Sequence, residues 1–249
     1  MLALIGGSGF SGSGVLSDTE TVEIDTPYGA PSAPIVLGKL GGTPVAFLLR
    51  HGPGHRFAPH TVPYRANLWA LKKLGVEGVV GVATVGGIAG PLGPGGIAVP
   101  DQLIDYTWGR EVTYYDRPEA GVKHVDMTHP FDRGLREELI AAAAALGKDL
   151  MTEGTYACTQ GPRLETAAEV RRYARDGADM IGMTLYPECA LARELDLPYA
   201  GICVSVNHAA GMGDSKDEID FESLHDVVER AVAKVVEVVE ETLRRRAAP

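Results

Sequence analysis

A short apolar stretch, Val45-Ala46-Phe47-Leu48-Leu49, runs directly into the polar residues Arg50-His51-Gly52. Five consecutive apolar residues bounded by Gly and Pro are typical of a strand that is buried on both faces of a sheet. Arg50 therefore stands at the carboxyl end of the strand, where open α/β sheets bind their ligands. Because a guanidinium suits phosphate, Arg50 is predicted to bind an anion there, and an ordinary surface ion pair is the alternative.

Similar apolar runs alternate with helical periods along the rest of the chain. Strands are predicted at residues 2–5, 35–40, 45–49, 79–83, 97–99, 155–158, 180–181 and 199–206. Helices are predicted at residues 64–74, 130–146, 165–176, 186–195 and 221–246, where apolar residues recur about every 3.6 positions. This alternation predicts an α/β fold whose central mixed β-sheet is flanked by helices. Since the sequence has neither an internal repeat nor a Pro/Ser-rich linker, residues 1–249 are predicted to form a single domain.

The composition is that of an ordinary globular protein, with 45% hydrophobic and 22% charged residues among 249. A formal net charge of -10 argues against a surface for nucleic acid or anionic membrane, which would need clustered Lys and Arg. Cys158, Cys189 and Cys203 lack C-x-x-C spacing, so neither a disulfide framework nor a zinc site is expected. No signal peptide or membrane-spanning helix is predicted, and the expected location is the cytoplasm.

A glycine-rich turn, Gly6-Gly7-Ser8-Gly9-Phe10-Ser11-Gly12, follows the first predicted strand and contains the G-x-G-x-x-G pattern of dinucleotide-binding folds. That pattern requires a helix to begin at the loop, whereas residues 13–29 are polar and have no helical period. A dinucleotide-binding oxidoreductase is therefore the less favoured class of enzyme. A plain tight turn and a phosphate loop that uses Ser8 with backbone N–H groups both remain open.

Two other predicted strand ends carry candidate ligand residues. The small residues around Thr84, in Ala83-Thr84-Val85-Gly86-Gly87, would let a ligand approach the backbone closely, although a tight turn explains them equally well. Met183 and Thr184 follow another strand. A methionine is more often a core residue than a ligand contact, and the Thr184 hydroxyl could simply cap the next helix.

Glu165 and Asn207 together suit the edge of a 6-oxopurine ring. An ionised carboxylate only accepts hydrogen bonds, whereas an amide both donates and accepts. The pair can therefore accept from a ring N–H on one side and donate to a carbonyl oxygen on the other.

Taken in order, these motifs resemble the trimeric purine nucleoside phosphorylase and methylthioadenosine phosphorylase family along nearly the whole chain. The positions that are similar to the methylthioadenosine branch are Arg50-His51-Gly52, His55, Pro59, Val62, Tyr64, Ala66-Asn67, Trp69-Ala70-Leu71-Lys72, Thr26-Pro27-Tyr28-Gly29, Asp101-Gln102, Gly161-Pro162-Arg163, Met183-Thr184 and Pro187-Glu188. The resemblance implies a single-domain nucleoside phosphorylase fold and a homotrimer. It also implies that no metal or redox cofactor is needed, because inorganic phosphate is the co-substrate.

The resemblance further implies a role for each matching position. Met183 would contact the ribose, while Asn207 would stabilise negative charge on the departing purine. The residues that would bind phosphate are Ser8, Arg50, His51 and Thr184, with the backbone of Thr84 beside them.

At the base, the chain departs from the methylthioadenosine branch, which has Ser in place of Glu165 and Asp in place of both Asn207 and Ala209. Glu and Asn at the first two places are similar to the 6-oxopurine phosphorylases. A 6-oxopurine offers N1–H to an acceptor and presents O6 and N7 to donors, so Glu165 and Asn207 would hold it. Leu164 replaces the aromatic residue that many relatives place against the base, so weaker stacking is expected.

Four residues would face the 5′ end of the sugar by the same resemblance. They are Phe221, Leu224 and His225, together with His124 from a neighbouring subunit. Ordinary nucleoside phosphorylases have a histidine that binds the 5′-hydroxyl where this chain has Phe221, so a 5′-methylthio group is expected. The two histidines leave room for a hydroxyl, and Phe221 could equally be the first core residue of an amphipathic helix.

These observations predict a pentosyltransferase of purine salvage that cleaves a 6-oxopurine nucleoside with phosphate. S-methyl-5′-thioinosine is the favoured substrate, and inosine, guanosine or methylthioadenosine are the alternatives. The expected partners are a small-molecule nucleoside and phosphate, without nucleic acid or membrane. The alternative outside enzymes is a non-catalytic nucleoside-binding protein, which would bind the base without any dependence on phosphate.

Overall fold

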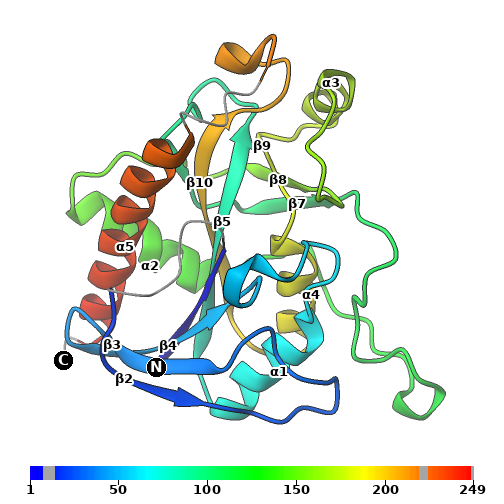
Figure 1. Ribbon diagram of the computed structural model, residues 1–249, viewed down its shortest axis with the longest axis vertical. Helices are drawn as coiled ribbons and strands as arrows, with labels where there is room; N and C mark the ends of the chain where they lie inside the picture. Colours follow the sequence, from blue (N-terminus) through cyan, green and yellow to red (C-terminus); the bar gives the residue numbers. More distant parts are fainter. Residues whose placement is uncertain (8–14, 219–223, 248–249) are drawn as a thin grey trace.

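The computed structural model describes residues 1–7, 15–218 and 224–247, with side chains in the last range from residue 227 onward. In these ranges, ten strands form one mixed sheet in the order β2-β3-β4-β1-β5-β9-β8-β7, with β10 beside β5 and β6 beside β10 (Figure 1). The strands are β1 (Leu2–Gly6), β2 (Ser17–Val22), β3 (Ile35–Leu40), β4 (Thr43–Leu49), β5 (Gly78–Gly87), β6 (Ile97–Ala98), β7 (Gln102–Asp105), β8 (Thr155–Cys158), β9 (Met180–Gly182) and β10 (Tyr199–His208). The helices are α1 (Tyr64–Leu74), α2 (Arg133–Ala145), α3 (Ala167–Arg175), α4 (Leu185–Glu194) and α5 (Leu224–Ala247).

The strands at the centre of the sheet run parallel. β1 pairs in parallel with β4 and with β5, and β5 pairs in parallel with β10. At one side, β2, β3 and β4 are joined by antiparallel pairing, and at the other side β9 runs antiparallel to β5. The predicted mixed α/β sheet is therefore confirmed. Because β1, β4, β5 and β10 are parallel, their carboxyl ends meet at one edge of the sheet.

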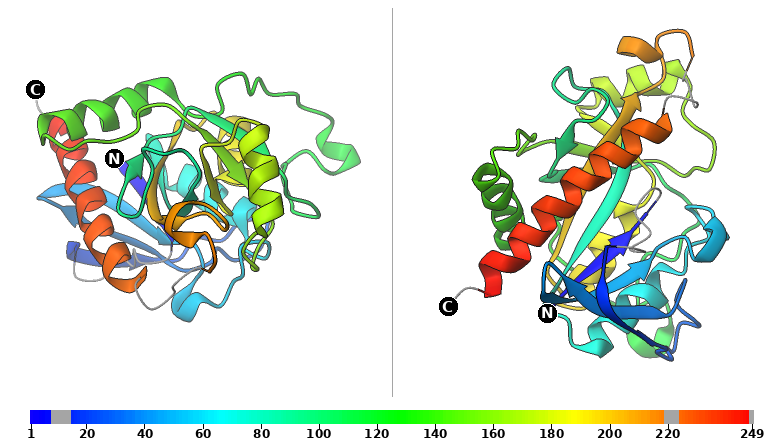
Figure 2. Two further views of the ribbon diagram at one scale, coloured as in Figure 1. Left: turned by 90° about the horizontal axis from the view of Figure 1, so that it is seen from above. Right: turned by 60° about the vertical axis from the view of Figure 1, so that its left-hand side comes forward.

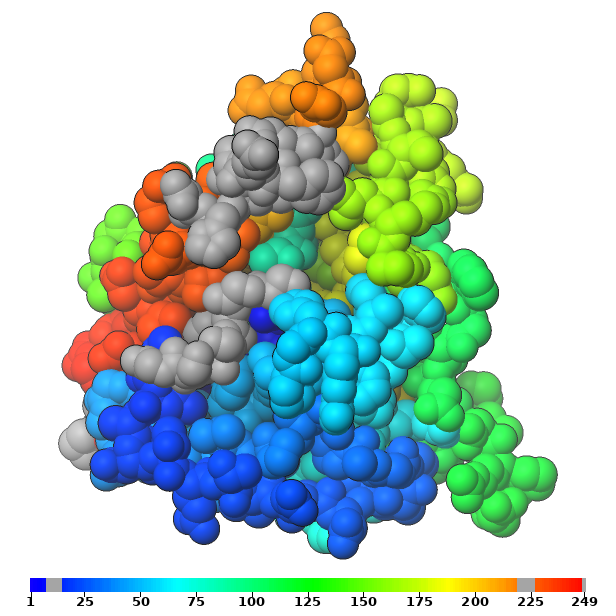
Figure 3. Space-filling view, viewed as in Figure 1, coloured from blue at the N-terminus to red at the C-terminus, as the bar shows by residue number. Residues whose placement is uncertain are grey.

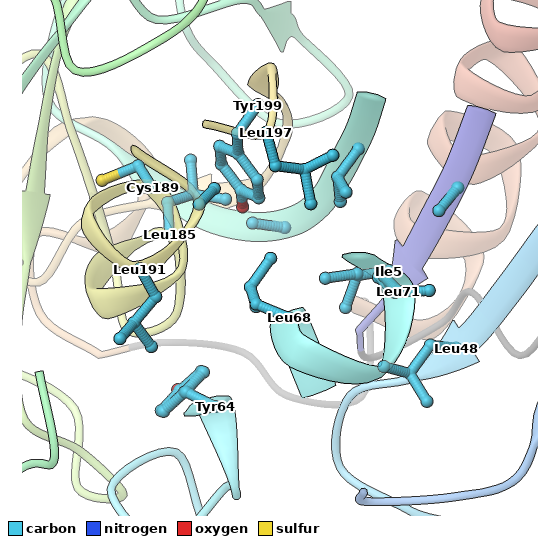
Figure 4. Packing of buried hydrophobic residues seen from close by; sticks show 14 of the residues in the cluster. Ile5, Leu48, Tyr64, Leu68, Leu71, Leu185, Cys189, Leu191, Leu197 and Tyr199 are labelled. Atoms are coloured by element: carbon cyan, nitrogen blue, oxygen red, sulfur yellow. The ribbon is translucent and has the colours of Figure 1, made fainter. Parts of the chain in front are cut away.

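Helices cover both faces of this parallel centre. In β1, the side chains of Leu2 and Leu4 belong to a core cluster with residues of α2 and α5, while Ala3 and Ile5 belong to a second cluster with residues of α1 and α4. Successive side chains of a strand point to opposite faces, so a strand buried on both faces reads as a continuous apolar run. Figure 4 shows the second cluster, and Figure 2 shows the long α5 lying along β10. No described helix is long and apolar enough to cross a membrane.

Two strands were not predicted. β2 lies in the polar stretch after the glycine-rich turn, and all but the last of its residues are exposed. β2 is the edge strand of the sheet and forms because it pairs antiparallel with β3. This pairing uses backbone hydrogen bonds, so it requires no pattern of apolar residues. β7 is half-buried and pairs with β8 at the opposite edge of the sheet.

The predicted helices are confirmed with shifts at their ends. α2 begins at Arg133 instead of residue 130, because the Asp132 side chain accepts a hydrogen bond from the N–H of Leu135 and caps the helix. α3 begins at Ala167 instead of residue 165, because Thr166 and Glu169 form a capping box. α5 was predicted from residue 221, and residues 221–223 lie outside the described part of the chain. The start of α3 matters for function, since it leaves Glu165 in the preceding loop.

The core packing generates a first prediction. Leu71 of α1 is fully buried in the cluster of Figure 4, so Leu71→Ala removes apolar contacts and leaves a cavity. We expect the free energy of unfolding to fall by about 2 to 5 kcal/mol, measured by urea denaturation. The matched control is Leu146→Ala, at a leucine that is 40% exposed, with an expected change below about 1 kcal/mol. Equal effects of the two substitutions would contradict the packing described here.

Candidate active site

A cavity of about 580 Å³ opens where β4, β5, β9 and β10 end. In Figure 3 its mouth lies between the cyan segment that contains residues 50–60 and the yellow-green segment that contains residues 160–175. Its size is that of sites for small molecules. The structure brings most of the predicted site residues together in its lining, namely Arg50, His51, Thr84, Leu164, Glu165, Met183, Thr184, Asn207 and Ala209.

The remaining predicted site residues are not in that lining. Ser8 and Phe221 lie outside the described residues. Leu224 and His225 form the first turn of α5, and their side chains are not described. His124 is exposed on the long connection between β7 and α2 and does not line the cavity of its own chain.

Arg50 forms a buried ion pair with Glu188 at the floor of the cavity. Its Nε lies 2.6 Å from Oε1 and its Nη2 lies 3.0 Å from Oε2, and neither side chain is more than 1% exposed. Tyr199 donates its hydroxyl to Oε2 of the same carboxylate at 2.6 Å. Although burial alone lowers the pKa of Arg50, the Glu188 carboxylate outweighs burial and raises that pKa above its usual value. The surface ion pair that the sequence left open for Arg50 is therefore wrong.

The remaining N–H groups of Arg50 are directed at the backbone and the cavity. Nη1 donates to the carbonyl of Val82 at 2.7 Å, and Nη2 reaches the carbonyl of Ile5 at 3.5 Å. A Cβ atom at Gly7 would lie 2.7 Å from Nη1, so only glycine lets this backbone approach the guanidinium. Since a guanidinium carries five N–H groups, the bonds within the described residues leave one on Nη1 for a ligand.

Thr184 stands directly before α4, at the N-cap position, but its side chain does not cap the helix. Its side chain makes no capping hydrogen bond, and its backbone N–H donates to the buried hydroxyl of Tyr156 at 3.1 Å. The helix-cap interpretation of Thr184 is therefore wrong. The Thr184 hydroxyl lines the cavity and is placed to donate to an anion there.

His51 is held in one tautomer. Its Nδ1 lies 2.8 Å from the carbonyl oxygen of Phe57, which can only accept, so Nδ1 carries a hydrogen. Burial lowers the pKa of His51, and the neighbouring Arg50 and His55 act in the same direction. The neutral ring then presents Nε2 as an acceptor, so an anion oxygen bound at Nε2 must itself carry a proton.

Glu165 lies on the loop before α3 and lines the same cavity as Arg50. The hydroxyl of Thr159 donates to its Oε1 at 2.6 Å. No other hydrogen bond to the Glu165 carboxylate occurs among the residues that the structure describes, so Oε2 is available to a ligand N–H.

Asn207 is turned into the cavity by a β-bulge. The register of β10 against β5 shifts between Ser205 and Asn207, so Val206 and Asn207 both line the cavity although they are neighbours on one strand. The Asn207 amide donates one N–H to the carbonyl of His208. Among the described residues, the second N–H and the side-chain carbonyl oxygen of Asn207 have no hydrogen-bond partner, so both remain for a ligand.

Arg110 supports the site and was missed by the sequence analysis. Its Nη1 donates to the carbonyls of Met183 and Tyr186, both at 2.8 Å, and its Nη2 donates to those of Thr159 and Gln160, both at 2.9 Å. It therefore fixes the two loops that carry Met183 and Thr159. The only signal in the sequence was its place in a loop rich in Gly and aromatic residues, and that composition does not reveal which carbonyls it binds.

Residues 2–244 match the model of the family described as the Phosphorylase superfamily. This chain belongs to that superfamily. The phosphorylase is 49% identical over 243 residues to a Xanthomonas campestris protein named probable S-methyl-5′-thioinosine phosphorylase, with 98% of this chain and 97% of the relative covered. It is also 49% identical over 208 residues to the S-methyl-5′-thioadenosine phosphorylase of Hyperthermus butylicus, with 83% and 75% covered. The solved methylthioadenosine phosphorylase of Schistosoma mansoni in complex with adenine matches with a TM-score of 0.92 at 31% identity, over 100% of this chain and 92% of that one.

These matches confirm the predicted family, fold and class of enzyme, a pentosyltransferase of the nucleoside phosphorylase type. The dinucleotide-binding alternative is wrong, and the glycine-rich pattern after β1 belongs to a phosphorylase. Within the described residues, no group of three or more His, Cys, Asp or Glu side chains is arranged to hold a metal ion. That the enzyme needs no cofactor besides phosphate stays a prediction.

The buried ion pair generates a second prediction. Glu188→Gln keeps the size of the side chain but leaves the buried Arg50 guanidinium without its counter-charge. We expect the free energy of unfolding to fall by about 3 to 5 kcal/mol, measured by urea denaturation. The control is Asp18→Asn, which breaks the exposed pair with Lys39 and should cost less than about 1 kcal/mol. A loss no larger than that of the control would contradict the role given to Glu188.

Proposed function

We propose that this phosphorylase cleaves 6-oxopurine nucleosides and that its favoured substrate is S-methyl-5′-thioinosine. The products would be hypoxanthine and 5-methylthioribose 1-phosphate. The observation that carries the proposal is that Glu165 and Asn207 line the same cavity as Arg50 and Thr184. Overall similarity does not choose the base, because a relative named for thioinosine and one named for thioadenosine are both 49% identical to this chain. The choice must therefore come from residues within the site.

The carboxylate of Glu165 favours a base that carries a hydrogen on N1. Hypoxanthine offers N1–H to Oε2, whereas adenine presents a lone pair at N1 to the same oxygen. Two opposed acceptors in a buried site cost roughly 1 to 3 kcal/mol or more. A site built around a hydrogen bond can reject a substrate that lacks the partner group by about 10⁴-fold. The free N–H of Asn207 would donate to O6 or N7 and stabilise the negative charge that develops on the departing purine.

Another part of the cavity lining suits phosphate. One Nη1 hydrogen of Arg50, the Thr184 hydroxyl and the backbone beside Thr84 supply donors, and Ser8 is the further phosphate residue that the family resemblance implies. Because Glu188 neutralises Arg50, phosphate would be bound mainly by directed hydrogen bonds. Held on the side of the ribose away from the base, phosphate would attack C1′ as the bond to N9 breaks. Met183, which also lines the cavity, would contact the ribose between the base and phosphate.

The preference for a methylthio group rests on the residues that the family resemblance assigns to the 5′ end of the sugar. Phe221 and Leu224 would offer apolar surface to the 5′ substituent, and burying one methylthio group is worth about 1 to 2 kcal/mol. His225 and His124 suit a hydroxyl instead, which keeps inosine and guanosine as the second candidates. S-methyl-5′-thioinosine and inosine differ only at the 5′ position, so a comparison of kcat/KM for these two nucleosides distinguishes the candidates.

A panel of nucleosides tests this function and gives the third prediction. We expect kcat/KM to be highest for S-methyl-5′-thioinosine, about tenfold lower for inosine and far lower for methylthioadenosine and adenosine, measured by release of free base. Release of base should require phosphate and should be unaffected by a chelator of divalent metal ions. Comparable cleavage of methylthioadenosine and methylthioinosine would refute Glu165 and Asn207 as the residues that read the base.

We also propose a homotrimer in which subunits share their active sites. His124 lies on the arm formed by residues 106–129, which projects from the body of the chain in Figure 1. Trp108 and Val122 on this arm are 72% and 81% exposed, so the arm offers apolar surface to a neighbouring subunit. Arg65 pairs with Glu111 and Asp116 and holds the base of the arm to α1. An arm held to the body of the chain in this way suits contact with the cavity of a neighbouring subunit.

Mixing two impaired variants, with inosine as the substrate because His124 suits its 5′-hydroxyl, tests the shared site and gives the fourth prediction. His124→Ala lacks the residue donated to the neighbour, and Asn207→Ala lacks a residue of its own cavity. When both proteins are unfolded and refolded together, some cavities would regain both residues, so activity should exceed that of either variant refolded alone. His129→Ala, at an exposed histidine of the same arm, is the control and should be active by itself. No gain on mixing would exclude shared sites.

A further inference from the structure

We propose that Thr159 is a positioning residue that sets the selectivity of the enzyme for 6-oxopurines by binding Oε1 of the Glu165 carboxylate, so that Oε2 is left to accept a hydrogen bond from the base. The inference rests on the function proposed above and adds to it a residue that does not touch the substrate. Thr159 directly follows β8 and is 5% exposed.

The direction of the hydrogen bond is fixed by its surroundings. The Thr159 hydroxyl has two acceptors within reach, Oε1 of Glu165 at 2.6 Å and the carbonyl of Gly182 at 3.4 Å. The shorter contact is to a charged acceptor, and such bonds are about twice as strong as neutral ones. The hydroxyl hydrogen therefore lies toward Glu165, and Oε2 is the oxygen left for the base.

Both ends of this bond are anchored. The backbone N–H of Thr159 donates to Gly182 at 2.8 Å, and its carbonyl accepts from Arg110 at 2.9 Å. On the other side, Glu165 immediately precedes Thr166, whose capping box with Glu169 fixes the start of α3. The carboxylate is thus held from its own loop and from β8, so its position depends little on the bound base.

The bond works against a 6-aminopurine. Glu165 can pair with the N1 lone pair of adenine only after it takes up a proton and becomes a donor. A protonated carboxyl is a weaker acceptor, so the bond from Thr159 loses strength when adenine is bound and keeps it when hypoxanthine is bound. Removing the Thr159 hydroxyl should therefore lower the ratio of kcat/KM for the hypoxanthine nucleoside to that for the adenine nucleoside.

The test compares Thr159→Val, which has the same shape without the hydroxyl, with Thr159→Ser, which keeps it. The readout is the ratio of kcat/KM for S-methyl-5′-thioinosine to that for methylthioadenosine. We expect Thr159→Val to lower this ratio by about tenfold and Thr159→Ser to leave it within about twofold of the wild-type value. The KM for phosphate should stay within about twofold of the wild-type value in both variants. A general disturbance of the fold would change this KM as well.

A double-mutant cycle with Glu165→Gln completes the test, because the effect of Thr159→Val on the ratio should vanish when no carboxylate is present. If Thr159→Val does not fold, Thr159→Ala takes its place with the same expectation. If the wild-type ratio is above one and neither Thr159→Val nor Thr159→Ala lowers it, the role of Thr159 is overturned and the proposed function stands. A wild-type ratio below one overturns the proposed function and this inference together.

Discussion

The buried pair of Arg50 and Glu188 is the interaction on which the site depends. Arg50 follows β4, Glu188 lies in α4, and the pair is bonded to Tyr199 at the start of β10 and to the carbonyl of Val82 in β5. Removing two charges from water costs several kcal/mol for each, and the cost is offset only when nearly every donor and acceptor finds a partner. Because a bidentate guanidinium bond tolerates little displacement, the pair fixes how β4, β5, β10 and α4 meet at the floor of the cavity.

Two groups of residues that line the cavity differ in their electrostatic character. Around Arg50, a neutralised cation, a hydroxyl and a neutral imidazole offer directed hydrogen bonds with little net charge. Around Glu165, a single carboxylate accepts a hydrogen bond from the hydroxyl of Thr159. This arrangement suits a reaction in which phosphate approaches one face of a sugar and a negatively charged purine leaves from the other face.

Residues 106–129 connect the interior of the site with the surface of the chain. Arg110 donates to the carbonyls of Met183 and Thr159, while Glu194 of α4 accepts hydrogen bonds from Thr113 and Tyr114 farther along the arm. The same segment exposes Trp108 and Val122. The segment therefore joins loops that line the cavity to an exposed apolar surface of the chain.

The sequence by itself determined the parts of the fold that leave a local pattern. Strands such as β4 were predicted because burial on both faces requires a continuous apolar run, and the candidate ligand residues were found because they directly follow such runs. Only the tertiary structure decided the rest. β2 is exposed and polar, and it became a strand through pairing with β3. Glu188 stands 138 positions from Arg50, and Arg110 binds carbonyls of loops 49 to 76 positions away, so no local period records either contact. A local pattern of apolar residues predicts which segments will be buried. The partner of a buried charge depends instead on how distant segments pack in space.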